Sequence, residues 1–410
     1  MPEQDSSRRK LVIVERKLVR NRGHQHTQIG ALQKMLPGHD LHLVTGEDYD
    51  GFLGEPTARI SARSRELSRL RWRIGNGSLR QKIDAVFRAA LSGQILSLPK
   101  SPYGRELSQV CDKLDLNTSD LLIVPSADLE ALESACQLVD ERKDRSPRLV
   151  LRFLDPELGE HKTARREERL GVLSEILSRK SNLSLFCETE EMAAHLNVQY
   201  GLDVQGGFYL PCSFDPAATC GPTVRDDSEA FRVGLFGAPR LGKGYERIAG
   251  IVPVLEKYLQ IAPFERPIEI LLQGSEENYA EGGIYAFARA YEAEEGALRI
   301  LSLSDRLDPA EFTDQFLSAD AILLPYDPSV YGLQGSGIIQ DAVAAEKFVI
   351  HSAGISMQSF LSHGNAVAAV SDEEFARGIL DLAKSGARET PGRSAARLHY
   401  LKSLSSHMPD

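Results

Sequence analysis

Short apolar runs alternate with helix-like segments along the whole chain of 410 residues. The runs are brief, rich in Val, Ile and Leu, and often followed by Ser, Gly or Pro; in the first half of the chain they are 10–14, 40–46, 120–126, 148–154, 183–188 and 206–211. Such runs are typical of strands buried on both faces of a parallel sheet. The segments between them, such as ADLEALESACQLVDERK, have helical periodicity and capping residues. The pattern predicts β/α alternation.

A polar segment with two prolines, 213–230, separates this series from a second one. The second series comprises the runs 231–237, 268–274, 298–304, 319–325 and 347–352. Two doubly wound α/β domains explain the length, which exceeds what one hydrophobic core supports. We expect an N-terminal domain over 1–215, a second domain over 216–385 and a C-terminal helical segment over 386–410. Ligands are expected at the carboxyl ends of the strands and in the cleft between the domains.

Composition and charge exclude several classes of protein. The net charge of −10 argues against nucleic-acid binding, which depends on a surplus of Lys and Arg to neutralise phosphates. The five cysteines form no CxxC pair, so the sequence predicts neither a disulfide framework nor a metal site of the zinc type. No apolar run approaches the roughly 18 residues that cross a bilayer, and the N-terminus has no apolar stretch of signal-peptide length. These features predict a cytoplasmic protein.

One stretch, from Arg59 to Lys82, is strongly basic: it has seven arginines and one lysine against a single acid, Glu66, and includes the only tryptophan, Trp72. It falls in a predicted helical insertion over about 55–110. One interpretation is a solvated surface insertion whose arginine stems cover apolar atoms. The other is a patch that meets anionic phospholipid or a lipid diphosphate, since basic residues beside an interfacial Trp suit that boundary. The second interpretation predicts peripheral contact at the inner face of the membrane.

Gly335, Ser336 and Gly337 lie together between the apolar run 319–325 and a helix-like segment. If these are a strand and a helix, the three residues lie at the helix N-terminus, where unpaired N–H groups and the positive end of the dipole favour an anion. A plain tight turn is the alternative. The glycines would let a phosphate approach, and the Ser336 hydroxyl adds a donor.

A second glycine-rich loop, in FGAPRLGKGYERI (236–248), has Arg240 and Lys243 flanked by Gly242 and Gly244. An Arg fork and a Lys point charge on a loop after a strand suit the dispersed charge of a diphosphate. A solvated basic loop is the alternative. Because the first and fourth strands of an open α/β domain can be neighbours, we expect this loop and the Gly335–Gly337 turn to close on one diphosphate.

The order of a strand, APRLGKG and then ADAILLPYDPSVYGLQGSGIIQDAVAAEKFVI resembles the carboxy-terminal domain of GT-B glycosyltransferases, in particular the retaining glycosyltransferase family 4 group. LFCETEEMAAHLNVQYG followed by LPCSFDP is similar to that family's passage into the second domain. The resemblance implies an α/β GT-B fold, in which two Rossmann-like domains face a central cleft. It assigns the donor diphosphate to Arg240 and Lys243, without a metal ion, and to the backbone N–H groups of Ser336 and Gly337.

The resemblance also assigns roles by position. Asp341 stands where the family has a glutamate that binds the donor ribose, and Leu333 stands where it has another glutamate. Glu346 and Phe348 replace the family's usual glycine and proline after the helix.

In the N-terminal half, the family places a glycine-containing loop near donor and acceptor, and Gly23, His24 and His26 occupy it here. We expect His24 to contact the substrates and His26 to be a solvent-exposed loop residue. Where many relatives have a histidine after a middle strand, this chain has Arg152 and Asp155, whose simplest interpretation is a structural salt bridge.

The resulting hypothesis is a retaining glycosyltransferase of polysaccharide biosynthesis that moves a sugar from a nucleotide-diphosphate sugar to a glycan or lipid-linked acceptor. The nucleotide sugar is a donor substrate, and no cofactor is expected. Two alternatives stay open. One is a nucleotide-sugar epimerase on the same fold, and the other is a degenerate GT-B domain kept for nucleotide-sugar binding or protein assembly.

Overall fold

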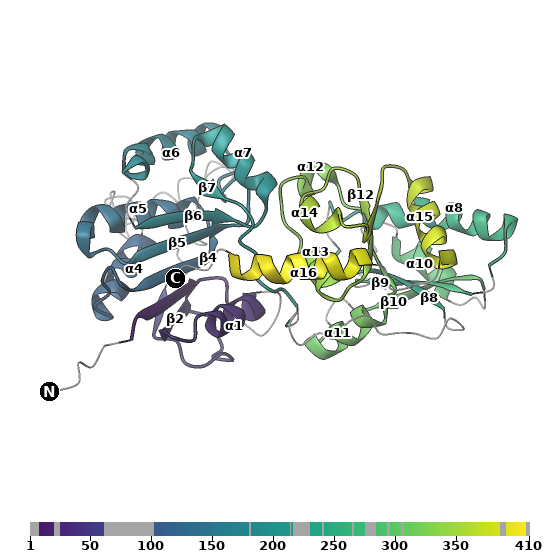
Figure 1. The fold of residues 1–410 in the computed structure, drawn as a ribbon, viewed down its shortest axis with the longest axis horizontal. Helices are drawn as coiled ribbons and strands as arrows, with labels where there is room; N and C mark the ends of the chain where they lie inside the picture. The colour runs from purple at the N-terminus through teal and green to yellow at the C-terminus, as the bar shows by residue number, and fades with distance from the viewer. Residues whose placement is uncertain are drawn as a thin grey trace, which may run out of the picture. The chain divides into compact units, whose positions relative to one another are not determined.

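The computed structural model describes residues 8–19, 25–60, 102–179, 182–213, 215, 230–239, 242–264, 266–274, 284–292, 296–304, 307–385 and 391–406. The chain divides into two compact units (Figure 1). The first comprises Met1–Glu188 and Ala193–Gly206, and the second comprises Thr189–Met192 and Gly207–Asp410. The segment from Gly207 to residue 215 therefore belongs to the second unit, whereas the sequence pattern assigned it to the first.

The first unit has a seven-stranded sheet of order β3-β2-β1-β4-β5-β6-β7, and every strand pair in it is parallel. Its strands are β1 (Lys10–Glu15), β2 (Asp40–Gly46), β3 (Ala58–Ile60), β4 (Leu121–Ala127), β5 (Arg148–Phe153), β6 (Leu183–Cys187) and β7 (Val204–Gln205). Its helices are α1 (Gln25–Met35), α4 (Pro102–Lys113), α5 (Leu129–Arg142), α6 (Thr163–Ser178) and α7 (Glu190–Tyr200), of which α7 begins within the second unit.

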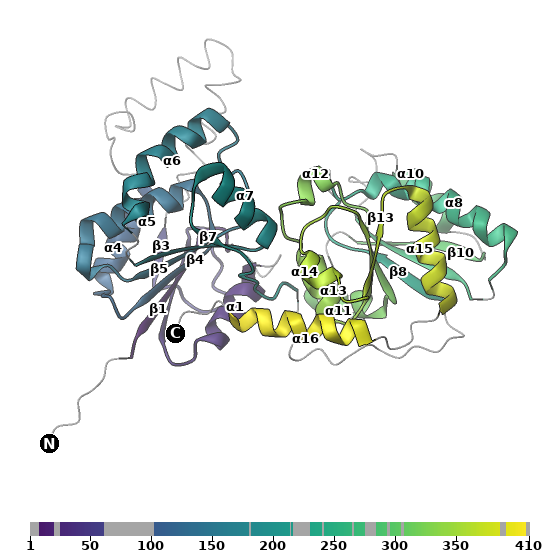
Figure 2. The ribbon, with the colours of Figure 1, turned by 45° about the horizontal axis from the view of Figure 1, so that its top comes forward.

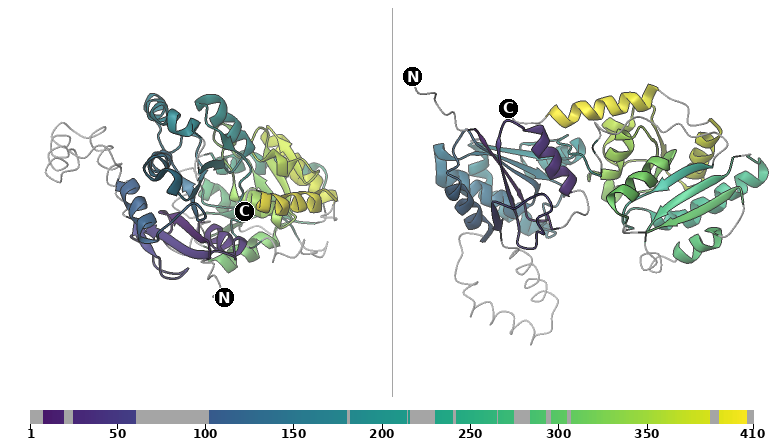
Figure 3. Two further views of the ribbon diagram at one scale, coloured as in Figure 1. Left: turned by 60° about the vertical axis from the view of Figure 1, so that its left-hand side comes forward. Right: turned by 90° about the horizontal axis from the view of Figure 1, so that it is seen from below.

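The second unit has a six-stranded parallel sheet of order β10-β9-β8-β11-β12-β13. Figure 3 shows the ribbon from two further sides. Its strands are β8 (Phe231–Leu235), β9 (Ile268–Gln273), β10 (Leu298–Leu303), β11 (Ala321–Leu324), β12 (Phe348–Ser352) and β13 (Ala366–Ala369). Its helices are α8 (Ile248–Ile261), α10 (Ile284–Glu292), α11 (Pro309–Ser318), α12 (Pro328–Tyr331), α13 (Gly337–Ala344), α14 (Gln358–Leu361), α15 (Asp372–Ser385) and α16 (Pro391–Ser406).

An apolar core joins α8, α10 and α15 to the strands of this second sheet. Figure 2 labels these three helices beside that sheet. Phe231, Val233 and Leu235 alternate along β8 and are fully buried in this core. Because strand side chains alternate between the two faces, these three residues share one face with the helices that cover it. Ten of the eleven apolar runs seen in the sequence are thus strands of two doubly wound sheets.

The predicted strand 206–211 is wrong, and the three strands β3, β7 and β13 were missed. The backbone from Gly206 to Pro211 forms no strand, and Gly207 has a positive φ of 82° that turns the chain out of β7. The apolar residues Phe208, Tyr209 and Leu210 are buried in the second unit instead. These missed strands have three, two and four residues respectively. Within the predicted insertion over 55–110, the structure describes β3 and the first turns of α4, and the basic stretch from 61 to 82 lies outside the described residues.

Each sheet reverses its winding between two strands that are far apart in the sequence. In the first unit β1 pairs with β4, and in the second β8 pairs with β11, with Val233 opposite Ala321. The expectation that the first and fourth strands of the second domain are neighbours is therefore confirmed. In open α/β sheets such a reversal leaves a crevice at the carboxyl ends of the two strands, where ligands bind.

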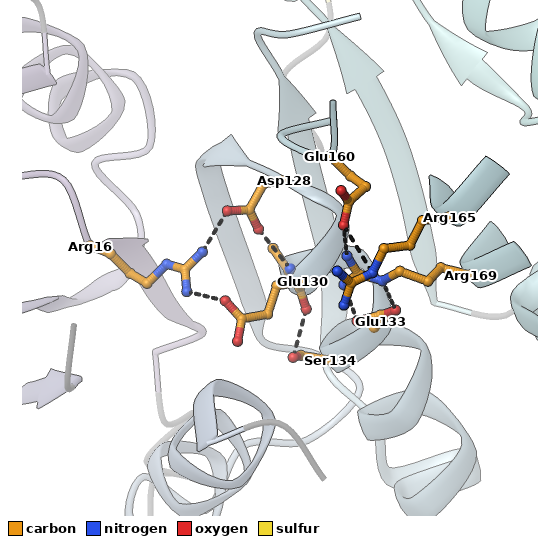
Figure 4. A network of polar contacts seen from close by, with 9 residues as sticks. Arg16, Asp128, Glu130, Glu133, Ser134, Glu160, Arg165 and Arg169 are labelled. Carbon is orange, nitrogen blue, oxygen red and sulfur yellow. Dashed lines mark hydrogen bonds and ion pairs between the residues drawn. The ribbon is translucent and has the colours of Figure 1, made fainter. Parts of the chain in front are cut away.

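A polar network joins the carboxyl ends of β1 and β4 in the first unit (Figure 4). Arg16 follows β1 and forms ion pairs with Asp128 at 2.7 Å and Glu130 at 2.9 Å, at the start of α5. The Asp128 carboxylate also accepts a 3.0 Å hydrogen bond from the Ala131 amide and so caps α5. The Arg16 guanidinium lies 4.2 Å from the centre of the Tyr103 ring. One arginine thus fixes β1, α4 and α5 together at this end of the sheet.

Candidate functional site

The candidate site lies in the second unit, at the carboxyl ends of β8 and β11. The loop after β8 packs directly on the segment after β11: the Asp327 amide donates a 2.8 Å hydrogen bond to the Gly242 carbonyl oxygen. Gly244 has a φ of 67°, and a Cβ at this position would clash with the backbone carbonyl of Pro325. Only glycine tolerates both the left-handed backbone and so close an approach. The glycines of this loop therefore bring two distant segments together.

Lys243 occupies the space between these segments and is only 6% exposed. Its ammonium lies 5.8 Å from the centre of the Tyr326 ring. It also lies so close to Gly237, at the end of β8, that a Cβ on that glycine would displace it. The ammonium is thus held at the reversal point of the sheet. Arg240, its predicted partner, lies outside the described residues.

The Gly335–Ser336–Gly337 turn leads into α13, which begins at Gly337 with Ser336 as its N-cap residue. The Ser336 hydroxyl makes no capping bond and lies 3.4 Å from the Tyr326 hydroxyl. The Ser336 amide donates to the sulfur of Met357 at 3.2 Å, a weak acceptor. In the part of the chain that the structure describes, the amides of Gly337 and Ile338 have no hydrogen-bond partner. These amides are the donors that a helix N-terminus offers to an anion.

The two loops meet at this point. Ile338, in the first turn of α13, lies 3.7 Å from where a Cβ on Gly237 would be. Tyr326 lies beside both Lys243 and Ser336. The tertiary structure therefore places a buried cation and the amino end of a helix together, an arrangement with which proteins bind phosphate groups.

The absence of a side chain at Gly337 also has a packing reason within the fold. A Cβ at this position would lie 2.9 Å from the sulfur of Cys212 and 3.1 Å from its Cβ. Both distances are shorter than ordinary carbon contacts, and Cys212 is buried. Packing against Cys212 therefore requires a glycine here.

Asp341 is buried on α13 and is 2% exposed. Its Oδ1 accepts a 3.0 Å hydrogen bond from the Ser213 amide, and its Oδ2 accepts a 2.5 Å hydrogen bond from the Ser213 hydroxyl. Burial raises the pKa of Asp341 to about 7, although both hydrogen bonds act to lower it. In this state the carboxylate holds the segment that enters the second unit. Its contact with a donor ribose stays a prediction.

The departures from the family pattern after α13 have a structural explanation in α16. Glu346 has a φ of 52°, the left-handed backbone for which glycine is usual. Its carboxylate accepts a 2.8 Å hydrogen bond from the Ser394 hydroxyl and lies 3.6 Å from the Arg397 guanidinium. Phe348 lies beneath the Arg393 guanidinium at 4.6 Å. Both residues thus contact the C-terminal helix α16, which lies along α13 in Figure 1.

Two further contacts tie the ends of this region. The Leu333 carbonyl oxygen accepts a 2.6 Å hydrogen bond from the Thr189 hydroxyl, which also caps α7. The Arg397 Nε donates a 3.1 Å hydrogen bond to the Ala344 carbonyl, one of the acceptors that the end of α13 leaves open. The candidate site is therefore anchored both before and after α13.

The predicted site residues of the N-terminal half are only partly described. Gly23 and His24 lie outside the described residues, as does Trp72. His26 belongs to the first turn of α1, half-buried and 6.0 Å from the Phe52 ring, so its assignment to a solvent-exposed loop is wrong.

Arg152 and Asp155 have different partners from the predicted structural salt bridge. Arg152 is fully buried and forms its ion pair with Glu188 at 3.1 Å. Asp155 accepts hydrogen bonds from the amides of Glu157 and Gly159.

No group of three or more His, Cys, Asp or Glu side chains that could hold a metal ion occurs among the described residues. The sequence contains one Asp-x-Asp segment, Asp48–Tyr49–Asp50, where Asp50 accepts a 3.2 Å hydrogen bond from the Phe52 amide. None of the described helices is both long enough and apolar enough to cross a membrane.

Sequence reasoning missed Tyr326, Cys212 and Ser213, each of which contacts a predicted site residue. For Tyr326 a signal was available, because it comes two residues after the end of β11 and the carboxyl ends of parallel strands carry ligand contacts. For Cys212 and Ser213 no local signal exists, since each meets α13 only through the fold.

No protein-family model and no curated protein matches the chain. Solved structures resemble it along nearly its whole length. Trehalose-6-phosphate synthase OtsA has a TM-score of 0.58 at 14% identity, covering 96% of this chain and 95% of that chain. HepE from Anabaena in complex with UDP has a TM-score of 0.58 at 12% identity, with the same coverage. An α,α-trehalose-phosphate synthase (UDP-forming) from Burkholderia xenovorans in complex with glucose-6-phosphate has a TM-score of 0.55 at 13% identity, covering 97% and 96%. At these identities the likeness shows the fold, which is GT-B.

Proposed function

We propose that this protein is a retaining glycosyltransferase that moves a sugar from a nucleotide-diphosphate donor to a glycan or lipid-linked acceptor. The observation that carries the proposal is the position of Lys243, buried at the end of β8 within the same small region as the open amides of Gly337 and Ile338. Structures with the same fold hold UDP or UDP-glucose, as their names state. That agreement supports a nucleoside diphosphate as the ligand.

The chemistry needs little more from the protein than charge and position. The bond between the anomeric carbon and the phosphate oxygen of the donor breaks, and the acceptor hydroxyl forms the new bond while its proton passes to the departing phosphate. Negative charge grows on the diphosphate as the bond breaks, so a fixed cation and a helix N-terminus bind the transition state more tightly than the ground state. Lys243 and α13 would supply this stabilisation without a metal ion, together with Arg240.

The departures at Glu346 and Phe348 do not favour the degenerate-domain alternative. Both residues contact α16, so their side chains serve the packing of the second unit rather than marking a decayed site. The epimerase alternative would need an acid and a base beside the sugar ring. The test below distinguishes both the epimerase and the degenerate domain from a glycosyltransferase.

The test is binding followed by turnover. UDP, GDP, ADP and their sugar conjugates are screened by thermal shift, since a ligand at a hundred times its Kd adds roughly 2.7 kcal/mol. Lys243→Ala should lose affinity and kcat together, each charge-assisted contact contributing about 1.5–3 kcal/mol. Lys257→Ala, which removes an exposed lysine from α8, is the control and should bind as the parent does.

Each outcome separates the alternatives. Release of nucleoside diphosphate with a glycosylated acceptor supports the proposal, and an anomeric configuration kept from donor to product supports retention. A changed sugar that is still attached to its nucleotide would identify an epimerase. Binding without turnover across a broad panel of acceptors would identify a degenerate domain. Absence of binding by all the nucleotides, or an unchanged Kd in Lys243→Ala, would overturn the proposed site.

For the acceptor, we propose contact with an anionic membrane or a lipid diphosphate through the basic stretch 59–82. Electrostatic attachment of this kind weakens steeply with salt. Co-sedimentation with vesicles containing phosphatidylglycerol should exceed that with neutral phosphatidylcholine vesicles. Replacement of Arg69, Arg71 and Arg73 by Ser should abolish the difference. Equal partitioning of the parent to both vesicles would contradict this part of the proposal.

A further inference from the structure

We infer that Tyr326 is a positioning residue of the candidate site, which orients Lys243 through its ring and Ser336 through its hydroxyl. The inference rests on the proposed function, because it deepens the account of the diphosphate site. Lys243 and Ser336 come from loops far apart in the sequence, and Tyr326 lies within reach of both.

Tyr326 is itself rigidly held. It is 1% exposed, and its ring packs against Tyr331 with a centroid distance of 4.3 Å and the two planes tilted by 36°. On either side its backbone is fixed by the loop after β8: the Pro325 carbonyl abuts Gly244, and the Asp327 amide bonds to Gly242. Because the backbone of Tyr326 is fixed on both sides, its side chain can hold the groups that it contacts in place.

The ring of Tyr326 acts on Lys243. At 5.8 Å from the ring centre, the ammonium lies within the range of a cation–π contact. The contact is buried, and such contacts strengthen when water is excluded. A lysine side chain has four rotatable bonds and loses much entropy when it is ordered. An ammonium that is already ordered over an aromatic face loses less conformational entropy when it binds the diphosphate.

The hydroxyl of Tyr326 acts on Ser336. The two hydroxyl oxygens are 3.4 Å apart, long for a hydrogen bond between hydroxyls, and either oxygen can donate. Among the described residues, the Ser336 amide donates only to the Met357 sulfur, a weak acceptor. Hydrogen bonds of a site often tighten only when its ligand binds. Tyr326 therefore orients the Ser336 hydroxyl at the N-terminus of α13.

Four variants of the full chain test the inference, with UDP as the calorimetric probe and GDP and ADP in parallel. Tyr326→Phe keeps the ring and removes the hydroxyl, and Tyr326→Leu removes both. Ser336→Ala and the double variant Tyr326→Phe/Ser336→Ala complete a cycle. Tyr258→Phe, which loses a 2.8 Å hydrogen bond to Glu373 elsewhere in the second unit, is the matched control and should bind as the parent does.

Tyr326→Phe should weaken binding about 2–10-fold, the loss of one hydrogen bond, and Tyr326→Leu a further ~2–30-fold through the lost cation–π contact. If the hydroxyl acts through Ser336, the double variant should bind no more weakly than Ser336→Ala alone. A role confined to stability would lower Tm and leave the Kd of the folded protein unchanged.

Two kinds of failure are distinguishable. A parent that binds none of the three nucleotides, or a Lys243→Ala variant that binds as the parent does, overturns the proposed function. A parent that binds and loses binding with Lys243→Ala, while both Tyr326 variants keep the parental Kd, overturns the positioning role alone. Full additivity of Tyr326→Phe and Ser336→Ala would also overturn it. If Tyr326→Leu fails to fold, the cycle with Tyr326→Phe decides the matter.

Discussion

Ser213 gives both of its hydrogen-bond donors to the carboxylate of Asp341: its amide reaches Oδ1 at 3.0 Å and its hydroxyl reaches Oδ2 at 2.5 Å. Asp341 lies on the helix whose amino end forms the candidate site, and Ser213 lies in the segment that enters the second unit. The entry of the chain into this unit is thus tied to α13. Because the Asp341 carboxyl group is nearly inaccessible to water, its contribution to stability depends on pH.

The first prediction concerns that dependence. Because the folded-state pKa of Asp341 is raised from 3.8 to about 7, the folded protein keeps a proton that the unfolded chain loses in this interval. The contribution of Asp341 to stability is therefore complete below about pH 4 and declines up to about pH 7, by as much as ~1.4 kcal/mol per pH unit. Asp341→Asn, an uncharged mimic of the protonated side chain, should lack this decline and be more stable than the parent at pH 8.

Urea unfolding of both proteins from pH 4.5 to pH 8 measures the effect, with Asp381→Asn, an exposed residue of α15, as the control. A difference between parent and Asp341→Asn that does not change with pH would contradict the assignment.

A second prediction concerns Gly337 and Cys212. Gly337→Ala should destabilise the protein by roughly 1–3 kcal/mol, because the new methyl group would press on the Cys212 sulfur at 2.9 Å. Replacing Cys212 by Ala in the same chain removes that sulfur, so the double variant should lose less than the sum of the two single losses. Gly171→Ala in α6, where a Cβ meets nothing within 4 Å, should instead be neutral or stabilising. Denaturant midpoints of the parent and the four variants measure these effects, and equal effects at Gly337 and Gly171 would refute the packing role.

Glu346 provides a third prediction, in which two effects oppose each other. A left-handed backbone costs a residue other than glycine about 1–2 kcal/mol, and Glu346→Gly removes this cost. The same change loses a hydrogen bond that contributes about 0.5–1.5 kcal/mol, so its net effect on stability should be small. Glu346→Ala loses the same contacts and keeps the strain, and should be less stable than the glycine variant by roughly 1–2 kcal/mol. Thermal unfolding of the three proteins gives the order. An alanine variant as stable as the glycine variant would mean that φ at this position carries no penalty.

The buried pair of Arg152 and Glu188 provides the fourth prediction. Arg152→Met should destabilise the protein by about 3–5 kcal/mol, because it leaves the Glu188 carboxylate buried without its cation. Arg152→Met/Glu188→Leu should recover much of this loss, since neither charge remains to be solvated. Chemical denaturation followed by circular dichroism measures both variants. A double variant less stable than Arg152→Met would show that the polar groups around Arg152, including Gln28 and the Pro125 carbonyl, matter more than the charge balance.

The strands and the site loops could be predicted for a common reason. A strand buried on both faces must be apolar along its length, so β1, β8 and β11 appear in the sequence as short runs without any knowledge of their neighbours. Gly242 and Gly244 were recognisable because a close approach excludes a side chain whatever the approaching group is. A Cβ would meet the Val330 side chain at Gly242 and the Pro325 carbonyl at Gly244. Position along the alternation then indicated that the loops after β8 and β11 belong to one site.

The identity of the group that meets each residue was decided only by the tertiary structure. A Cβ on Gly337 would meet Cys212, a neighbour that the sequence did not indicate, and the Asp341 carboxylate, which the family pattern assigns to a ribose, accepts hydrogen bonds from Ser213. Glu346 departed from the family pattern in the sequence, and the structure supplies its partners, Ser394 and Arg397 of α16. Periodicity is a local property that the backbone imposes on the sequence. A packing partner across the fold leaves no local trace, because its contact depends on how distant segments are brought together.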